Sequence, residues 1–142
     1  MMTKDPDCIF CKIVAGTISC TKVYEDANVL AFMDIGPISP GHTLVIPKKH
    51  YESVMEMPPG EVAAMFEPVG ILAGAVKAAL QAHGVNVLQN NGATAGQVVP
   101  HLHIHVIPRW PDDGLGFRWP SKKADFAVLG RQAEAIQAAL KA

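Results

Sequence analysis

The 142 residues predict one α+β domain built around a mainly antiparallel sheet. Several short apolar segments with strand-like alternation lie between turn signals, one long alanine-rich segment is helical by composition, and an amphipathic segment closes the chain. No repeat, low-complexity segment or linker divides the sequence, so residues 1–142 are expected to form a single domain.

The first elements expected along the chain are a short helix or turn and three strands. The helix or turn follows Asp7 and ends at Gly16. The turn Asp26-Ala27-Asn28 separates the first two strands, and a loop rich in proline and glycine precedes the third. The three strands are expected at Lys22–Glu25, 28–35 and 42–47.

A long helix is expected after the stop signal at residues 58–60. Pro68 lies inside it, so the sequence predicts either a kink there or a helix start near Glu67. Small side chains line one side of this helix, which indicates either close packing on its own sheet or close approach to the same helix of a second subunit. These residues are Gly70, Ala73, Gly74, Ala75, Ala78 and Ala79. Further on, the expected elements are a strand at 85–89, a polar loop at 90–96, a strand at 101–107, an irregular segment at 108–120 and an amphipathic helix at 125–142.

Three histidines alternate with branched apolar residues in the run His101-Leu102-His103-Ile104-His105-Val106-Ile107. A strand sends alternate side chains to opposite faces, so the imidazoles would share one face at intervals of about 6.7 Å. At this spacing at most two of them can meet on one metal ion without help. The alternative is phosphoryl or nucleotidyl chemistry, in which one imidazole attacks phosphorus and a neighbour holds phosphate oxygens or protonates the leaving group.

The loop just before this run favours the second option. Residues 90–97 carry no bulky side chain, so phosphate oxygens can approach backbone N–H groups there. The loop is not a P-loop, because no Gly-Lys-Ser/Thr follows it.

Composition excludes several classes of protein. The net charge of −1 provides no basic surface for nucleic acid. The most apolar stretch, 61–82, is interrupted by Glu61, Glu67 and Lys77, so we expect no membrane span. The polar N-terminus and the three cysteines predict a reduced, cytoplasmic protein without a signal peptide or a disulfide framework.

The segment Gly96-Gln97-Val98-Val99-Pro100 together with the histidine run resembles the signature of the histidine-triad (HIT) family. Three further blocks resemble the family: Ile9–Ile13, Ala31–Ile35 and Gly41–His50. The resemblance runs from about residue 8 to residue 109 and leaves an extension at 110–142 that no motif covers. It implies the HIT-like fold, a homodimer and a nucleotide hydrolase or transferase acting at the α-phosphate.

The resemblance also assigns catalytic roles. His103 corresponds to the nucleophile that forms a covalent nucleotidyl-imidazole, and its other ring nitrogen must be held by an acceptor. His105 corresponds to the residue that contacts phosphate and helps to protonate the leaving group. Gln97 is close enough in sequence to touch the same phosphate or leaving group.

The same resemblance predicts a purine-nucleotide site. Asp34 would accept hydrogen bonds from both ribose hydroxyls, and His42 either supports the site or is a structural histidine. Val98 stands where many family members have Ser or Thr, so one hydroxyl contact to phosphate is missing. The base would lie among Ile9, Phe10, Ile13 and Phe32, and the phosphate and ribose near Asn90 and Gly96.

Cys8-x-x-Cys11 resembles a zinc-binding subset of the family. With His50 and His101 as imidazole partners, two thiolates would form a closed, tetrahedral site for one structural zinc ion per chain. A redox pair and an idle pair of thiols are the alternatives, although no βαβ context favours the redox pair. Cys20 has no evident partner.

The function expected from these observations is cleavage of nucleoside 5′-phosphoramidates or related nucleotides through an intermediate on His103. Two alternatives stay open within nucleotide binding: a dinucleoside polyphosphate hydrolase, in which Arg109 meets polyphosphate charge, and a non-catalytic purine-nucleotide-binding regulator. A metal-storage or redox protein built on Cys8 and Cys11 is a third.

Overall fold

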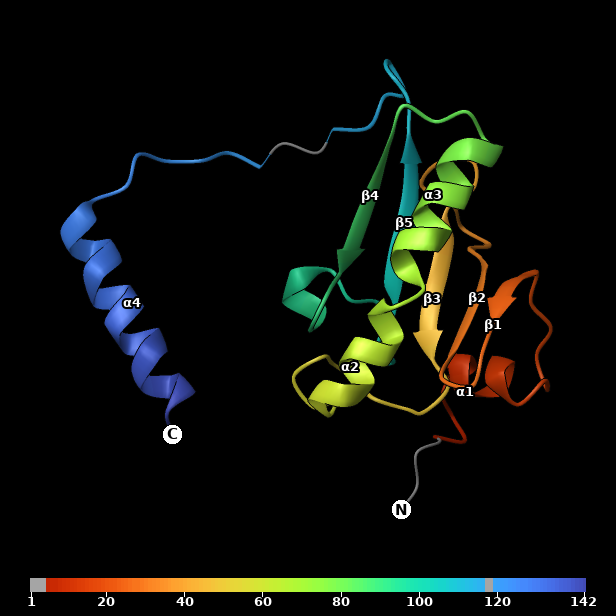
Figure 1. Cartoon of the computed structure of the whole chain (residues 1–142), viewed down its shortest axis with the longest axis horizontal. Coiled ribbons are helices and arrows are strands. Elements are labelled where there is room, and N and C mark those ends of the chain that lie inside the picture. Colours follow the sequence, from red (N-terminus) through yellow and green to blue (C-terminus); the bar gives the residue numbers. More distant parts are fainter. Residues whose placement is uncertain (1–4, 117–118) are drawn as a thin grey trace.

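The computed structural model describes residues 5–116 and 119–142 (Figure 1). Its body is a five-stranded sheet in the order β1-β2-β3-β5-β4, and each pair of neighbouring strands is antiparallel. The expected α+β class is confirmed. The strands are β1 (Lys22–Glu25), β2 (Val29–Met33), β3 (Thr43–Pro47), β4 (Gly84–Gln89) and β5 (Ile104–Arg109), and the helices are α1 (Ile9–Val14), α2 (Pro59–Phe66), α3 (Val69–Ala79) and α4 (Phe126–Leu140).

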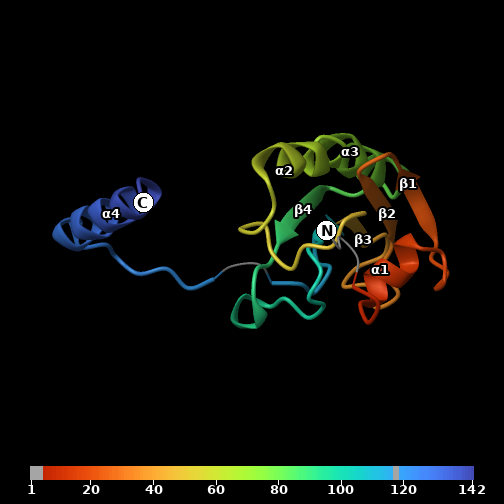
Figure 2. The same cartoon turned by 90° about the horizontal axis from the view of Figure 1, so that it is seen from below.

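The strand register separates two faces of the sheet. Phe32 pairs with Leu44 and Leu44 pairs with His105, so these three side chains form a row on one face. The neighbouring pair Ala31 and Val45 points to the opposite face. Helix α1 packs on the first face, and α2 and α3 cover the second, where the larger core cluster lies (Figure 2).

The expected long helix is divided at Pro68 into α2 and α3, because a proline ring cannot donate the backbone N–H that a continuous helix needs. Helix α3 buries Val69, Leu72 and Val76 against the sheet. By length and composition alone, Pro59–Ala79 could cross a membrane. In this fold the buried side chains of that segment belong to the main core.

Of the small residues of α3, Ala73 packs against the main core, and the others point away from it. A Cβ atom added to Gly70 or Gly74 would meet nothing within 4 Å, and Ala75 and Ala78 are exposed as well. Ile71, between the two glycines, is 79% exposed. Packing against the protein's own sheet therefore explains Ala73 but not the other small residues, which form an open surface on α3.

Beyond β5 the chain leaves the body as a tail, and α4 lies beyond the β4 edge (Figure 1). The guanidinium of Arg109 fixes the start of this tail by donating to Asp113 at 2.7 and 3.1 Å, to the Leu115 carbonyl at 2.6 Å and to Asn86 at 2.8 Å. Asp125 caps the N-terminus of α4, and this 15-residue helix has no buried residue.

Candidate active site and metal centre

The histidines of the run lie on the α1 face and belong to two adjacent sites. Strand β5 begins at Ile104, three residues later than expected, so His101 and His103 precede it. The alternation nevertheless continues through them, because Leu102 and Ile104 are both buried in the core on the opposite face. The backbone N–H of Leu102 donates to the Tyr51 carbonyl at 2.7 Å, which holds this segment outside the strand ladder.

The first site is a cluster of two cysteines and two histidines. Cys8 Sγ lies 3.4 Å from His101 Nδ1, and Cys11 Sγ lies 3.6 Å from the same nitrogen. His50 Nδ1 is 3.4 Å from Cys11 Sγ and 3.2 Å from His101 Nδ1. All four candidate ligand atoms lie within 4.8 Å of one another. This is the Cys₂His₂ set that the Cys-x-x-Cys motif predicts.

The protonation states at this cluster fit a zinc ion. His101 Nε2–H donates to the Pro47 carbonyl at 3.0 Å, so in the neutral ring Nδ1 carries the lone pair toward the thiols. Burial lowers the pKa of His101 to about 4 and raises the pKa of the Cys11 thiol. A neutral imidazole is the form that binds metal, and a cation would offset the cost of ionising buried thiols.

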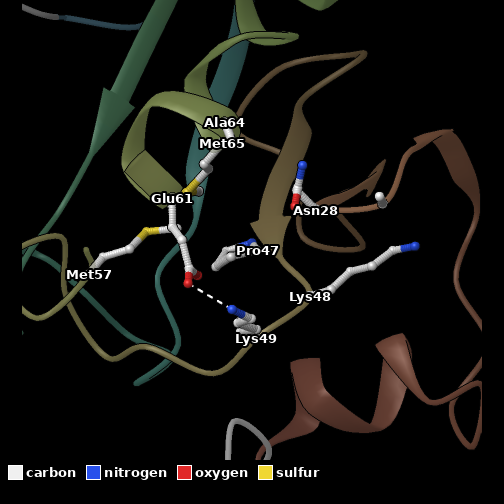
Figure 3. A pocket seen from close by; sticks show the side chains of 9 residues that line it. Asn28, Pro47, Lys48, Lys49, Met57, Glu61, Ala64 and Met65 are labelled. Carbon is white, nitrogen blue, oxygen red and sulfur yellow. Dashed lines mark hydrogen bonds and ion pairs between the residues drawn. The ribbon is translucent and has the colours of Figure 1, made fainter. Parts of the chain in front are cut away.

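Glu61 of α2 binds the side chains of the two residues that flank His50. Its carboxylate accepts hydrogen bonds from Lys49 Nζ at 2.7 Å and from the Tyr51 hydroxyl at 2.9 Å. Figure 3 shows the Lys49–Glu61 ion pair at a small pocket of about 50 Å³ that the histidine run does not line. Helix α2 therefore supports the metal cluster through the neighbours of one ligand.

The second site contains His103. Its Nδ1–H donates to the backbone carbonyl of His101 at 2.7 Å, so Nε2 of the neutral ring carries a free lone pair. The Phe10 ring meets His103 edge-on at 5.3 Å between centroids and His101 at 5.7 Å. A buried imidazole with one nitrogen fixed and the other unshared has the properties of a nucleophile.

His105 is fixed by a chain of hydrogen bonds that runs through His42. The Ile38 backbone N–H donates to His42 Nδ1 at 3.1 Å, so the proton of neutral His42 lies on Nε2. His42 Nε2–H in turn donates to His105 Nδ1 at 2.9 Å, which leaves the His105 proton on Nε2. Burial lowers the pKa of both rings, to about 4 for His105, with smaller contributions from neighbouring histidines.

The resulting pair of rings is complementary. The centroids of His103 and His105 are 4.8 Å apart, one ring with a free lone pair and the other with a free N–H. His42 is buried, and its Nε2 also lies 3.6 Å from Asp34 Oδ2. Of the two roles open to His42, support of the site is the one that this geometry favours.

Asp34, His42 and His105 also place ligand atoms within 4.8 Å of one another. A metal ion on His42 Nε2 would move the ring proton to Nδ1, where it would oppose the Ile38 N–H. The hydrogen bonds therefore favour a proton network at this cluster and a metal at the Cys₂His₂ cluster.

The rings of His103 and His105 both line a cleft of about 360 Å³, within the range of small-ligand sites. Its wall is mostly apolar, with Asp34 and the two imidazoles on it. Asp34 Oδ1 accepts the Gly36 N–H at 2.8 Å, which orients the carboxylate. The predicted residues on this wall are Ile9, Phe10, Ile13, Phe32, Asp34, Gly96, Val98, His103 and His105.

Gln97 and Asn90 are not on the cleft wall. The Gln97 amide donates to the carbonyls of Glu52 at 2.7 Å and Val99 at 3.0 Å and accepts the Gly92 N–H at 2.7 Å. These bonds tie the side chain to the loop and to the Glu52 backbone, and its contact with phosphate stays a prediction. Asn90 lies beneath Gly96, where its amide reaches the Gly96 carbonyl at 3.5 Å.

The loop uses part of the backbone groups that were expected to meet phosphate. The N–H groups of Ala95, Gly96 and Gln97 all donate to carbonyls within residues 92–97. Gly96 adopts a φ of +95°, which a residue with a Cβ rarely adopts. These three N–H groups therefore stabilise the loop itself, next to the cleft wall.

Other residues on the cleft wall were not anticipated from the sequence. Leu44 could have been identified from strand register, because it pairs with Phe32 and so shares its face. The segment between α1 and β1 had no such signal, since it has no regular structure. The additional lining residues are Ile18, Ser19, Cys20, Met33, Ile35, Leu44 and Val99.

Fold and site together describe an α+β domain whose cleft carries a pair of histidines, beside a cluster of two thiols and two imidazoles. Residues 15–112 match the model of the HIT domain, and the chain belongs to the HIT family. It is 44% identical to adenylylsulfatase HINT3 of Arabidopsis thaliana over 95% of this chain and 67% of that protein. It is 47% identical to an adenosine 5′-monophosphoramidase of Schizosaccharomyces pombe over 80% of this chain and 84% of that protein.

Solved structures of similar proteins extend the comparison to nearly the whole chain. A Streptococcus mutans protein, 45% identical, superposes on 99% of this chain and 89% of its own with a TM-score of 0.95. A zinc-bound histidine triad family protein from Mycobacterium smegmatis is 40% identical, with a TM-score of 0.74 over 95% of this chain and 96% of its own. The Cys₂His₂ cluster assigns the present chain to the zinc-binding members of the family.

Proposed function

We propose that this HIT-family nucleotide hydrolase cleaves adenosine 5′-phosphoramidates and related nucleotides at the α-phosphate through a nucleotidyl intermediate on His103. The observation that carries the proposal is the His103 ring on the cleft wall, with Nδ1–H bonded to the His101 carbonyl at 2.7 Å and Nε2 unshared. The adenosine phosphoramidase and adenylylsulfatase among its relatives act on substrates of this class.

In the first half-reaction His103 Nε2 forms a bond to phosphorus while the bond from phosphorus to the leaving nitrogen breaks. The electron pair goes to the leaving nitrogen, which accepts a hydrogen bond from His105 Nε2–H and leaves as the free amine with a proton taken from solvent. The new bond makes the His103 ring cationic, and the neutral His105 ring, 4.8 Å away between centroids, adds no second positive charge. Water then attacks phosphorus, gives up a proton to solvent and releases His103 with the electron pair of its bond to phosphorus.

The cleft accounts for the binding of the nucleoside. Phe10 and Phe32 offer apolar surface to a base, and Asp34 offers a carboxylate to the ribose hydroxyls. Val98 is 88% exposed at the edge of this cleft and adds no hydroxyl donor. Arg109 uses its guanidinium in the tail, so the structure gives no support for a contact with polyphosphate.

The test is turnover of adenosine 5′-phosphoramidate together with mass analysis of acid-quenched enzyme. The wild-type protein should accumulate a covalent adenylyl group on His103, and His103→Ala should lose both the adduct and turnover. His83→Ala is the control, because His83 is exposed and outside the cleft. Turnover by His103→Ala would contradict the proposal, and tight AMP binding without turnover by the wild type would favour the regulator.

The Cys₂His₂ cluster supports one structural zinc ion per chain, held by Cys8, Cys11, His50 and His101. When bound, the ion would supply a rigid cross-link between segments and no open position for substrate. All three cysteines are free thiols, as expected for the reducing cytoplasm, where we place the protein. Metal analysis of the purified chain should find about one zinc per chain for four such ligands.

We also propose a homodimer. The exposed small residues of α3 would let a second helix approach closely, and the exposed side chain of Ile71 would offer it apolar surface. Helix α4 also presents apolar side chains without burying any of them: Phe126 is 85% exposed and Leu140 80% exposed. Light scattering of the full-length chain should give twice the 15.2 kDa mass.

A further inference from the structure

We propose that the Cys₂His₂ site controls the nucleotide cleft: a zinc ion bound there holds helix α1 and the His101 carbonyl in the positions that the cleft requires. The proposal rests on the proposed function for its meaning in catalysis. The control acts through two physical connections, one through a helix and one through a hydrogen bond.

The first connection is helix α1. Cys8 and Cys11 flank two residues of the cleft wall, Ile9 and Phe10, and Ile13 follows one turn later. The helix has six residues, too few to persist in water without tertiary anchors. Its anchors are the buried Phe10 ring and the two buried thiols. A metal ion on the thiols would therefore fix one wall of the cleft.

The second connection is the backbone of His101. Its side chain joins the metal cluster through Nδ1, and its Nε2–H bonds to the Pro47 carbonyl at the end of β3. Its own carbonyl accepts the His103 Nδ1–H at 2.7 Å. The residue that would bind the ion thus also selects the tautomer of the nucleophile.

Phe10 links the two connections. Its ring lies edge-on to both His101 and His103, at 5.7 and 5.3 Å between centroids. Without an ion, protonated thiols are weak hydrogen-bond partners for the imidazoles, so α1 would be held chiefly by Phe10. Movement of α1 would then displace the ring that packs on the nucleophile. Cys8, Cys11 and His101 are positioning residues in this scheme.

The experiment compares full-length protein loaded with zinc, stripped by a chelator, and reloaded with zinc. Stripping should weaken AMP binding about 10-fold by calorimetry, a typical loss when the support of a site is removed. Amide hydrogen exchange at residues 9–14 should accelerate while β2 and β3 keep their protection. At fixed pH, ring ¹⁵N shifts of His103 should change from one tautomer to a mixture, and reloading should reverse all three effects.

Matched variants on α1 separate loss of a ligand from loss of a side chain. Cys11→Ser should behave as the stripped protein, whereas Lys12→Ser, with the same incoming residue one position further on, should behave as the loaded protein. Unchanged AMP affinity and α1 exchange in the zinc-free protein would overturn the proposal. Loss of protection throughout the sheet would also overturn it, because the ion would then stabilise the whole fold. If the loaded protein does not bind AMP, the proposed function fails, while the exchange and ¹⁵N data still decide the coupling.

Discussion

Single hydrogen bonds give the residues of this site their distinct chemical roles. His101, His103 and His105 are the same residue type within one run, yet each is held in a different environment. His101 turns a lone pair to the thiols, His103 turns one toward the cleft, and His105 keeps an N–H. Two of the deciding partners, the Pro47 carbonyl for His101 and His42 for His105, are distant in sequence. The residue pattern therefore indicated which residues matter, and the fold was needed to show how they differ.

His42 is predicted to act through His105. In His42→Ala, the donor to His105 Nδ1 is lost, so the neutral ring spends part of its time with its proton on Nδ1. We expect kcat for adenosine 5′-phosphoramidate to fall about 100-fold, the usual scale of general acid–base assistance, while KM changes little. Steady-state kinetics of His42→Ala and of the control His83→Ala would check this, and equal losses in both would contradict it.

Acid is predicted to destabilise the protein through its buried histidines. The pKa of His105 is about 4 in the fold against an ordinary 6.5, so the unfolded chain binds more protons between these values. The stabilising contribution of neutral His105 is therefore complete above pH 6.5 and is lost as the pH falls toward 4. Between pH 7 and pH 5, the free energy of unfolding measured with urea should fall less for His105→Gln than for the wild type. An equal fall in the two proteins would contradict His105 as the origin of the effect.

For the strands, local sequence signals predicted where each one lies, and tertiary contacts decided at which residue it begins or ends. Strand β1 covers Lys22–Glu25 as expected, because its alternation and its turn are both local. Strand β5 begins late because the Leu102 N–H donates to the Tyr51 carbonyl, in the segment after β3, and does not join a strand ladder. Tertiary contacts also decide the place of Gln97, because its proximity in sequence to the histidine run could not reveal that its amide closes the loop.

The tail provides a prediction for Arg109. In Arg109→Ala, four hydrogen bonds that hold residues 109–115 are lost, so this segment should become more accessible to protease. Turnover of adenosine 5′-phosphoramidate should stay near the wild-type value, because Arg109 does not line the cleft. Limited proteolysis with mass mapping would measure the first effect. A large rise in KM for dinucleoside polyphosphates alone would instead return Arg109 to a role in binding substrate.

For the whole molecule, the packing of helix α1 on the sheet explains why one short run of sequence contributes to two sites. Helix α1 lies across the end of the run, so its two thiols reach His101 while Phe10 reaches His103. Cleft walls from the segment between α1 and β1, such as Ser19 and Cys20, arise only from this packing. No local pattern encodes that contact, which is why sequence alone missed it.

On the exposed face of α3, we predict that one substitution stabilises the protomer but dissociates the dimer. A Cβ at Gly74 meets nothing within 4 Å in the protomer, and replacing a helical glycine by leucine or alanine stabilises a helix by up to about 1 kcal/mol. A leucine there would, however, prevent close approach of a second α3. In Gly74→Leu, the midpoint temperature of thermal unfolding, measured at low protein concentration, should not fall. Light scattering of the same variant should show dissociation to a 15.2 kDa monomer. Gly74→Ala should dissociate less, because a methyl group separates the helices less, and an intact Gly74→Leu dimer would exclude this face as the interface.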